Sequence, residues 1–366
     1  MTISTLIFDM DGVITTEEKY WACARLTLWE LVTQTLHLPN AMGDAVHSAD
    51  ARAAVVADNL IYLLKDRAVN SNWDSTYILA CAYLAELDNV RLYEAADLAD
   101  LLLMLEADAA QVGDRVSVEW PGALIRFLKR TEPLTGHALI AAAGRQLEDA
   151  ASYHHGDLLK PDREFWQYLR DRFQRFYHGD TMRDYDGDPL IDGTAIPAPA
   201  IEATLRGLRD AGFTLGTATG RPSEEIQDAL GALGLLHYFD PARFGTQTTV
   251  RLAEAATGRQ GLGKPHPYSL LRALYPDAHP ERLLDPAFQA QSRPGVLMIG
   301  DAPGDPMMAR AAGCRCVGVL TGVRGEAARR SRERLLVEAG CEAVLPDMTA
   351  LPAWLEAEGR VNVKAF

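Results

Sequence analysis

The sequence of 366 residues is poor in positive charge and has no long apolar segment. It contains 36 lysines and arginines against 50 aspartates and glutamates, which gives a formal net charge of -14. An acidic chain without a long basic run repels nucleic acids and anionic membrane surfaces. No apolar stretch approaches the roughly 18 residues that a membrane-spanning helix needs. We therefore expect neither a nucleic-acid partner nor a membrane partner.

Cysteines are few, and their spacing does not suggest paired thiols. The five cysteines are odd in number and include no Cys-x-x-Cys pair. Cys314 and Cys316 lie in an apolar run, where we expect buried core thiols. The N-terminus is a short apolar segment without the basic start and long apolar region of a signal peptide. These features favour a reducing, cytoplasmic location.

Three short apolar runs end at polar clusters. Residues 6–8 lead into Asp9, residues 213–218 into Thr219, and residues 296–299 into Gly300 and Asp301. Each run precedes a stretch with a helical pattern, and this alternation is typical of an α/β fold with a doubly wound, Rossmann-like parallel sheet. In such sheets ligands bind beyond the carboxyl ends of the strands. We expect the polar clusters to meet there.

The middle of the chain has a different pattern. Residues 20–112 are rich in alanine and leucine, and residues 117–180 are also mainly helical in pattern. An apolar stripe, interpreted as core, is formed by Phe165, Trp166, Leu169, Phe173 and Phe176. Residues 179–199 are dense in Asp, Gly and Pro, which indicates turns and a linker. The predicted division is therefore a core of residues 1–18 and 196–366, with a large helical domain of residues 19–195 inserted after the first strand.

Carboxylates dominate the clusters at the ends of the first and third runs. Asp9 and Asp11 lie two positions apart, and Asp301 and Asp305 lie four apart. Carboxylates held so close repel each other, and a divalent cation removes the conflict. Mg²⁺ prefers a few hard oxygen ligands and keeps water and phosphate oxygens as the others. We expect Asp9, Asp11, Asp301 and Asp305 to form a Mg²⁺ site.

Two further motifs suit a phosphate group. Thr219-Gly-Arg-Pro follows the second run, where a hydroxyl and backbone N–H groups can donate to phosphate oxygens. Lys264 lies in Gly-Leu-Gly-Lys-Pro-His-Pro, a stiff loop that presents its ammonium group ahead of a helix. Each motif alone could be a helix cap, a solvated turn or a surface lysine. Their order, together with the carboxylate pairs, favours a joint site.

In these four motifs the sequence resembles the haloacid dehalogenase superfamily. The family patterns are a DxDG-type start, a Thr or Ser at a second strand end, a lysine in a GKPxP-type loop and a GDxxxD segment. They are matched by Asp9 to Gly12, Thr219, Lys264 with its prolines, and Asp301 with Asp305. The resemblance covers residues 1–20 and 195–345. Many members carry a helical cap at the position of the insert, which is larger here than usual.

The resemblance implies a role for each matched residue. Asp9 would be the nucleophile that forms an aspartyl-phosphate, and Asp11 the general acid and base. Thr219 would hold the phosphoryl oxygens, and Lys264 would offset negative charge. Asp9, the backbone carbonyl of Asp11 and Asp301 would hold Mg²⁺, with Asp305 in support. The second aspartate of the first motif argues against halide chemistry, since the dehalogenase branch lacks it.

The expected function is a Mg²⁺-dependent phosphatase acting on a small phosphorylated metabolite. Two alternatives stay open. A sugar-phosphate mutase of the β-phosphoglucomutase type uses the same aspartates, although Thr16 stands where that family usually has Asp. A binding protein without activity would normally have lost the nucleophile or the lysine. Substrate-contacting candidates in the insert, each more often a surface residue, are Lys65, Arg67, His154, His155 and Lys160.

Overall fold

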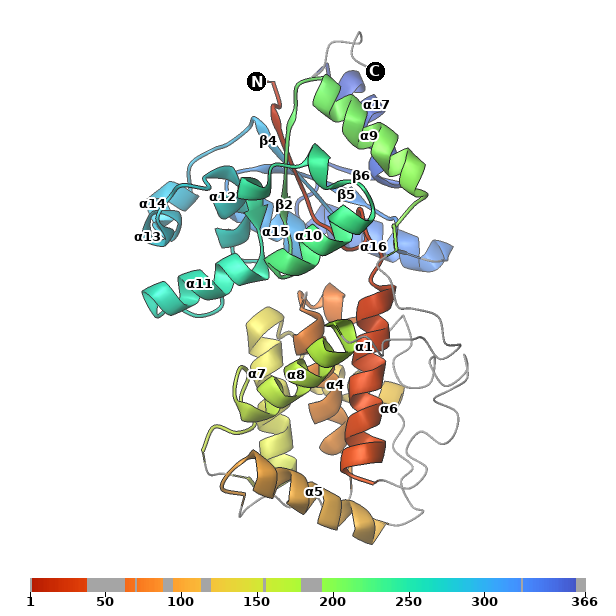
Figure 1. Ribbon diagram of the computed structural model, residues 1–366, viewed down its shortest axis with the longest axis vertical. Helices are drawn as coiled ribbons and strands as arrows, with labels where there is room; N and C mark the ends of the chain where they lie inside the picture. The colour runs from red at the N-terminus through yellow and green to blue at the C-terminus, as the bar shows by residue number, and fades with distance from the viewer. Residues whose placement is uncertain are drawn as a thin grey trace. The chain divides into compact units, whose positions relative to one another are not determined.

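The structure is a computed structural model, drawn in Figure 1. It divides into two compact units: unit 1 joins Met1–Glu17 to Asp192–Phe366, and unit 2 is Glu18–Ile191. All strands of the described residues belong to unit 1. The residues that the structure describes are 2–37, 63–69, 71–87, 95–112, 120–153, 156–178, 193–323 and 325–359.

Unit 1 is built on a parallel six-stranded sheet with the order β3-β2-β1-β4-β5-β6. This confirms the doubly wound fold and the three predicted strands. The central strand β1 pairs with β2 on one side and β4 on the other, so the strand order reverses beside it. Such a reversal is where ligands bind in open α/β sheets. The strands are β1 (Thr5–Phe8), β2 (Thr214–Ala218), β3 (Phe244–Gly245), β4 (Val296–Gly300), β5 (Arg315–Val319) and β6 (Ala343–Leu345).

Both faces of this sheet are covered, which explains why its strands are continuous apolar runs. Leu6 and Phe8 of β1 pack into one apolar cluster, and Ile7 between them packs into the other. The first cluster includes side chains of α9 (Ala198–Asp210), α10 (Ser223–Ala232) and α17 (Leu351–Ala357). The second includes side chains of α11 (Gln247–Thr257), α12 (Tyr268–Leu274), α15 (Gly304–Ala311) and α16 (Glu326–Ala339).

Short helices fill the connections of unit 1. They are η4 (Leu236–Tyr238), η5 (Pro241–Arg243), α13 (Pro280–Leu283), α14 (Pro286–Gln289) and η6 (Met348–Ala350). Arg293, after α14, is buried and donates to four backbone carbonyls. It therefore fixes the loops on either side of it.

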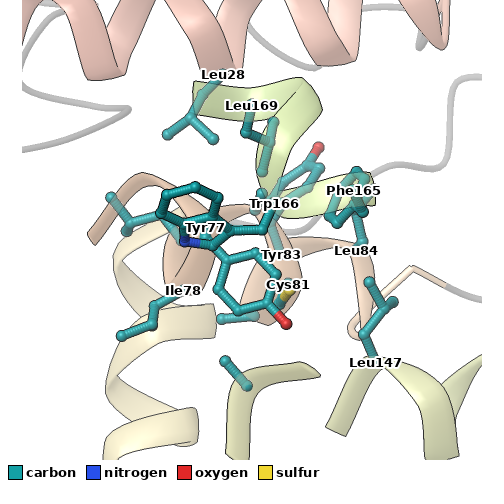
Figure 2. Close-up of a cluster of buried hydrophobic side chains, with 14 of the residues drawn as sticks. Leu28, Tyr77, Ile78, Cys81, Tyr83, Leu84, Leu147, Phe165, Trp166 and Leu169 are labelled. Carbon is teal, nitrogen blue, oxygen red and sulfur yellow. The ribbon is translucent and has the colours of Figure 1, made fainter. Parts of the chain in front are cut away.

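Unit 2 is helical throughout its described residues. Trp166 and Phe165 lie at the centre of its core with Tyr77 and Tyr83 (Figure 2). The indole N–H of Trp166 donates to Asp74 at 2.8 Å, so this aromatic group has a partner within the unit. The elements are α1 (Glu18–Trp29), the π-helix η1 (Glu30–Thr35), α4 (Asn72–Leu84), α5 (Leu98–Val112), α6 (Trp120–Arg130), α7 (Gly136–Ala150) and α8 (Glu164–His178).

The predicted aromatic stripe of α8 is core, as the sequence suggested. Phe165, Trp166, Leu169 and Phe173 are buried, and Phe176 packs against the same cluster while remaining partly exposed. Within the ranges given above, none of the helices combines the length and hydropathy of a segment that crosses a membrane.

The two cysteines expected in the core differ in burial. Cys316 is buried in β5, with its sulfur 3.7 Å from that of Cys341. Cys314 is only partly buried, because it precedes β5 in the turn after α15. The core prediction is therefore correct for Cys316 and only partly correct for Cys314.

Two linker segments of unit 1 pair with each other. The chain runs toward unit 2 through Thr15 and Thr16 and returns through Gly193 and Thr194. Thr15 and Thr194 form an antiparallel bridge, and the Thr16 N–H donates to the Gly193 carbonyl at 2.9 Å. Thr15 also bridges to Asp11. The outgoing linker is therefore held close to the first motif.

Candidate active site

Neighbouring parallel strands bring three of the motifs to one edge of the sheet. Asp9 follows β1, and its backbone N–H extends the ladder by donating to the Ile299 carbonyl of β4 at 2.8 Å. Asp301 follows β4 directly. Thr219 follows β2 on the other side of β1, and its N–H donates to Gly245 at 2.9 Å. The register of the sheet thus places three predicted residues at its carboxyl edge.

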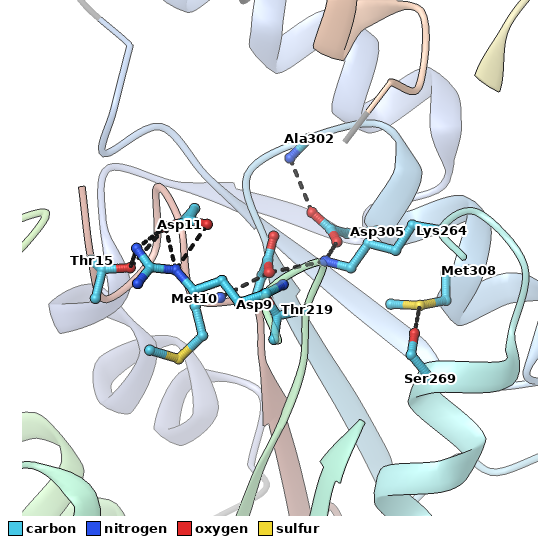
Figure 3. A network of polar contacts seen from close by, with 11 residues as sticks. Asp9, Met10, Asp11, Thr15, Thr219, Lys264, Ser269, Ala302, Asp305 and Met308 are labelled. Carbon is cyan, nitrogen blue, oxygen red and sulfur yellow. Dashed lines mark hydrogen bonds and ion pairs between the residues drawn. The ribbon is translucent and has the colours of Figure 1, made fainter. Parts of the chain in front are cut away.

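Lys264 joins the two acidic motifs (Figure 3). Its Nζ lies 2.9 Å from Oδ1 of Asp9 and 2.7 Å from Oδ1 of Asp305. The lysine side chain is almost fully buried, at 4% exposure. Burial opposes its charge, but the carboxylates of Asp305 and Asp9 outweigh burial and raise the pKa of Lys264 above its usual range. The ammonium is therefore a fixed positive charge beside Asp9.

Asp305 is the most enclosed of the carboxylates, at 1% exposure. Its Oδ2 accepts a hydrogen bond from the Ala302 N–H at 3.1 Å. Burial raises the pKa of Asp305 to about 6; Lys264 opposes this rise, and the nearby Asp9 and Asp301 add to it. The ionised form of this carboxylate therefore depends on compensation by a nearby positive charge.

Two glycines allow the acidic loops to approach each other. Gly12 has φ +75°, and a Cβ there would lie 2.2 Å from Oδ2 of Asp301. A Cβ on Gly300 would lie 2.3 Å from Oδ2 of Asp305. A side chain at either position would displace a carboxylate of the site. The glycine of the first motif thus contributes directly to the position of Asp301.

The carboxylates form a group that could hold a metal ion. Asp9, Asp301 and Asp305 are all buried, and each offers an oxygen within 4.8 Å of the others'. One ammonium, that of Lys264, bridges two of these three acids. Buried charges require compensation, and hard oxygen donors suit a divalent cation such as Mg²⁺. The donor set therefore fits the expected metal.

The Asp11 side chain pairs with Arg221, a residue to which the sequence reasoning gave no role. Nε of Arg221 lies 3.0 and 3.1 Å from the two carboxylate oxygens of Asp11. Its backbone N–H also donates to Oγ1 of Thr219 at 3.2 Å. Arg221 stands two positions after Thr219 in the second motif. That position beside Thr219 was the one signal in the sequence, and the pairing with Asp11 is visible only in the fold.

Arg332 is a second buried arginine that the sequence did not single out. It lies on α16 at 3% exposure, and its Nη1 donates to the backbone carbonyl of Asp301 at 3.3 Å. It therefore supports the loop that follows β4. Nothing in the pattern of α16 distinguishes this arginine from its exposed neighbours.

The candidates of the insert have no common site among the described residues. Arg67 donates to three backbone carbonyls at and beyond the end of α6, so its role is structural. Lys160 forms an exposed ion pair with the aspartate three positions before it. Lys65 is buried. His154 and His155 lie outside the described residues.

Comparisons with known proteins relate this chain to hydrolases. A family model described as HAD-hydrolase-like matches residues 261–349, which include Lys264, Asp301 and Asp305. These matches support a hydrolase of the haloacid dehalogenase (HAD) superfamily. The phosphoglycolate phosphatase of Yersinia pseudotuberculosis is 27% identical over 208 residues, which is 53% of this chain and 71% of that protein. The phosphoglycolate phosphatase of Escherichia coli K12 is 28% identical over 173 residues, covering 46% and 53%.

A solved structure has the same fold as this chain. An X-ray structure of a structural genomics target superposes with a TM-score of 0.68 at 23% identity. The match covers 97% of this chain and 99% of that one, so it extends over the helical insert. At this identity the likeness shows the fold alone.

Proposed function

We propose that this HAD hydrolase is a Mg²⁺-dependent phosphatase of a small phosphate monoester, with Asp9 as its nucleophile. The observation that carries the proposal is the contact between Asp9 and Lys264. A buried carboxylate at a strand end, held by a fixed ammonium and facing Asp301 and Asp305, suits attack on an anionic phosphoryl group. The curated phosphatase relatives support the same reaction class.

The proposed reaction has two half-steps that share one nucleophile. A carboxylate oxygen of Asp9 forms a bond to phosphorus while the bond to the ester oxygen breaks, and Asp11 gives a proton to that oxygen. In the second half-step Asp11 takes a proton from water, whose oxygen bonds to phosphorus. The bond between Asp9 and phosphorus then breaks, which releases inorganic phosphate. Each half-step returns Asp11 to the state that the other needs.

The remaining residues compensate negative charge and position the phosphoryl group and the metal. Lys264 offsets the negative charge of Asp9 and of the phosphoryl group, and Thr219 donates to phosphoryl oxygens. Asp9, the Asp11 backbone carbonyl and Asp301 would hold Mg²⁺, with Asp305 supporting the site. Bound there, Mg²⁺ supplies positive charge for the transferring phosphoryl oxygens.

Phosphorus NMR separates this proposal from the mutase alternative. The purified protein is incubated with Mg²⁺, 2-phosphoglycolate and a panel of sugar phosphates, with and without glucose 1,6-bisphosphate. Growth of an inorganic phosphate signal that needs no bisphosphate supports a phosphatase. Conversion of glucose 1-phosphate to glucose 6-phosphate that depends on the bisphosphate would show a mutase. 2-Phosphoglycolate belongs in the panel because the curated relatives are named for it.

We also propose that the helical insert, residues 19–195 in the sequence-based division, is a cap that selects the substrate. Support comes from unit 1, where the outgoing linker is bridged to both Asp11 and the returning linker. Movement of this linker would therefore change the position of Asp11. Small-angle scattering tests the idea, since Mg²⁺ with beryllofluoride should make the protein more compact. An unchanged radius of gyration, with the adduct confirmed by mass, would contradict closure.

A further inference from the structure

Arg221 contacts both carboxylate oxygens of Asp11, the proposed general acid and base. It lies in the turn between β2 and α10 at 2% exposure. Its Nε and Nη2 both donate to the Asp11 carboxylate. Planar, charge-assisted contacts of this kind fix the rotation of a carboxylate as well as its position. Figure 3 shows Asp11 and Thr15 on one side of Asp9 and Lys264 on the other.

The same guanidinium also contacts the outgoing linker. Nη2 of Arg221 lies 3.1 Å from Oγ1 of Thr15 and 3.4 Å from the Thr16 carbonyl. The Thr15 hydroxyl in turn donates to Oδ1 of Asp11 at 3.0 Å. Arg221, Thr15 and Asp11 therefore form a closed ring of contacts. The acid is held from the second motif and from the linker together.

A purely structural arginine of this protein has different contacts. Arg293 is buried to a similar degree, at 7% exposure, yet its side-chain hydrogen bonds go to backbone carbonyls and a tyrosine hydroxyl. Arg221 instead holds an ionisable side chain that the proposed mechanism uses in both half-steps. Burial alone does not distinguish the two residues, but their partners do.

We propose that Arg221 is the positioning residue of Asp11, aligning its carboxylate for proton exchange with the ester oxygen and with water. This inference rests on the proposed phosphatase function. Proton transfer requires a narrow range of distance and direction. Without its contacts to Arg221, the Asp11 side chain would adopt many orientations outside that range. Arg221 itself does not need to touch the substrate.

The inference predicts a dependence on the leaving group. An alkyl phosphate releases a strongly basic oxygen that needs a proton, whereas 4-nitrophenyl phosphate releases a stable anion. General acid catalysis contributes about 10²- to 10⁴-fold. Arg221→Met should therefore lower kcat/KM by about a hundredfold for the best alkyl phosphate of the panel, and by less than about tenfold for 4-nitrophenyl phosphate. Using kcat/KM isolates the first half-step.

The experiment compares variants of the full chain with both esters. Asp11→Asn should show the same selective loss, and Arg221→Lys a smaller one, because an ammonium keeps the charge but cannot bridge both oxygens. Arg293→Met is the matched control: it should lower the thermal midpoint and affect both esters equally. If Arg221→Met does not fold, Arg221→Lys decides alone.

The outcomes separate this inference from the function on which it rests. A selective loss for Asp11→Asn and Arg221→Met together supports it. A selective loss for Asp11→Asn, with equal loss for both esters in the folded Arg221 variants, would overturn the role of Arg221 and leave the phosphatase intact. Failure of the unmutated protein to hydrolyse any phosphate monoester would instead reject the proposed function.

Discussion

At the scale of single residues, Asp9 has the most demanding position. Its backbone N–H donates to the Ile299 carbonyl, and its carboxylate pairs with Lys264. The same carboxylate belongs to a group of three buried acids. Asp9→Asn keeps the size of the side chain but removes the nucleophile. We expect turnover to fall by at least about a thousandfold, as for loss of a covalent nucleophile.

The measurement is phosphate release under saturating Mg²⁺, with the thermal midpoint recorded for both proteins. The unmutated protein should also bind beryllofluoride covalently at Asp9, detected by peptide mass. An adduct on another residue, or substantial turnover by a folded Asp9→Asn protein, would reject Asp9 as the nucleophile.

Asp301 offers a test of the metal site that does not depend on activity. Asp301→Asn removes one negative charge from the group of three buried carboxylates. We expect Mg²⁺ affinity, measured by calorimetry without substrate, to weaken by at least about tenfold. Asp285→Asn is the control, because Asp285 is an exposed cap of α14 and loses the same charge. Equal affinities in all three proteins would move the metal site elsewhere.

At the scale of elements, the turn after β1 and the loop after β4 form one structure. Gly12 lies in the first and packs against Asp301 in the second. Gly12→Ala adds a Cβ at a positive φ and against a carboxylate. We expect it to lower the free energy of unfolding by about 1–3 kcal/mol and to reduce Mg²⁺ affinity.

Chemical denaturation and calorimetry check this prediction. Gly231→Ala in α10 is the matched control, because nothing lies within 4 Å of a Cβ built there. In a helix this change should be neutral or stabilising by about 0.5–1 kcal/mol. A Gly12→Ala protein as stable as the control, with full metal affinity, would contradict the close packing of the two loops.

The strands that carry motifs were predictable because buried parallel strands are continuous apolar runs. Residues 6–8, 213–218 and 296–299 have this pattern and end at polar clusters. β3 and β6 were missed because two or three residues leave no periodic signal, and the apolar run of β5 was interpreted only as core and not as a strand. A role of Lys264 beside Asp9 was expected from the family resemblance, but the pairing of Arg221 with Asp11 depends on how a turn folds back across the sheet. Single-residue reasoning does not reveal such tertiary partners.

At the scale of the whole molecule, sequence pattern foresaw a helical insert but not its internal arrangement. The predicted boundaries were residues 18 and 196, and the compact units of the structure divide after Glu17 and after Ile191. The candidates chosen in the insert by charge do not share a role: Arg67 caps the end of α6, and Lys160 is paired at the surface. The charge of a residue in a helical segment does not by itself predict which groups that residue contacts in the folded unit.

The place of β1 in the sheet has a consequence for the order in which the protein forms. Thr5 pairs with Thr214 on one side and Val296 on the other, so the first strand to be synthesised must wait for partners more than 200 residues later. Unit 2 has all its sequence between them, and its described elements are helices whose backbone hydrogen bonds are local, although α1 and α4 pack against the later helix α8. Distant pairings form slowly, and helical blocks form quickly. In refolding followed by pulsed hydrogen exchange, we expect amides of α4 and α8 to be protected before those of β1. Simultaneous protection of all three would mean that the acidic site and the helical unit assemble as one cooperative structure.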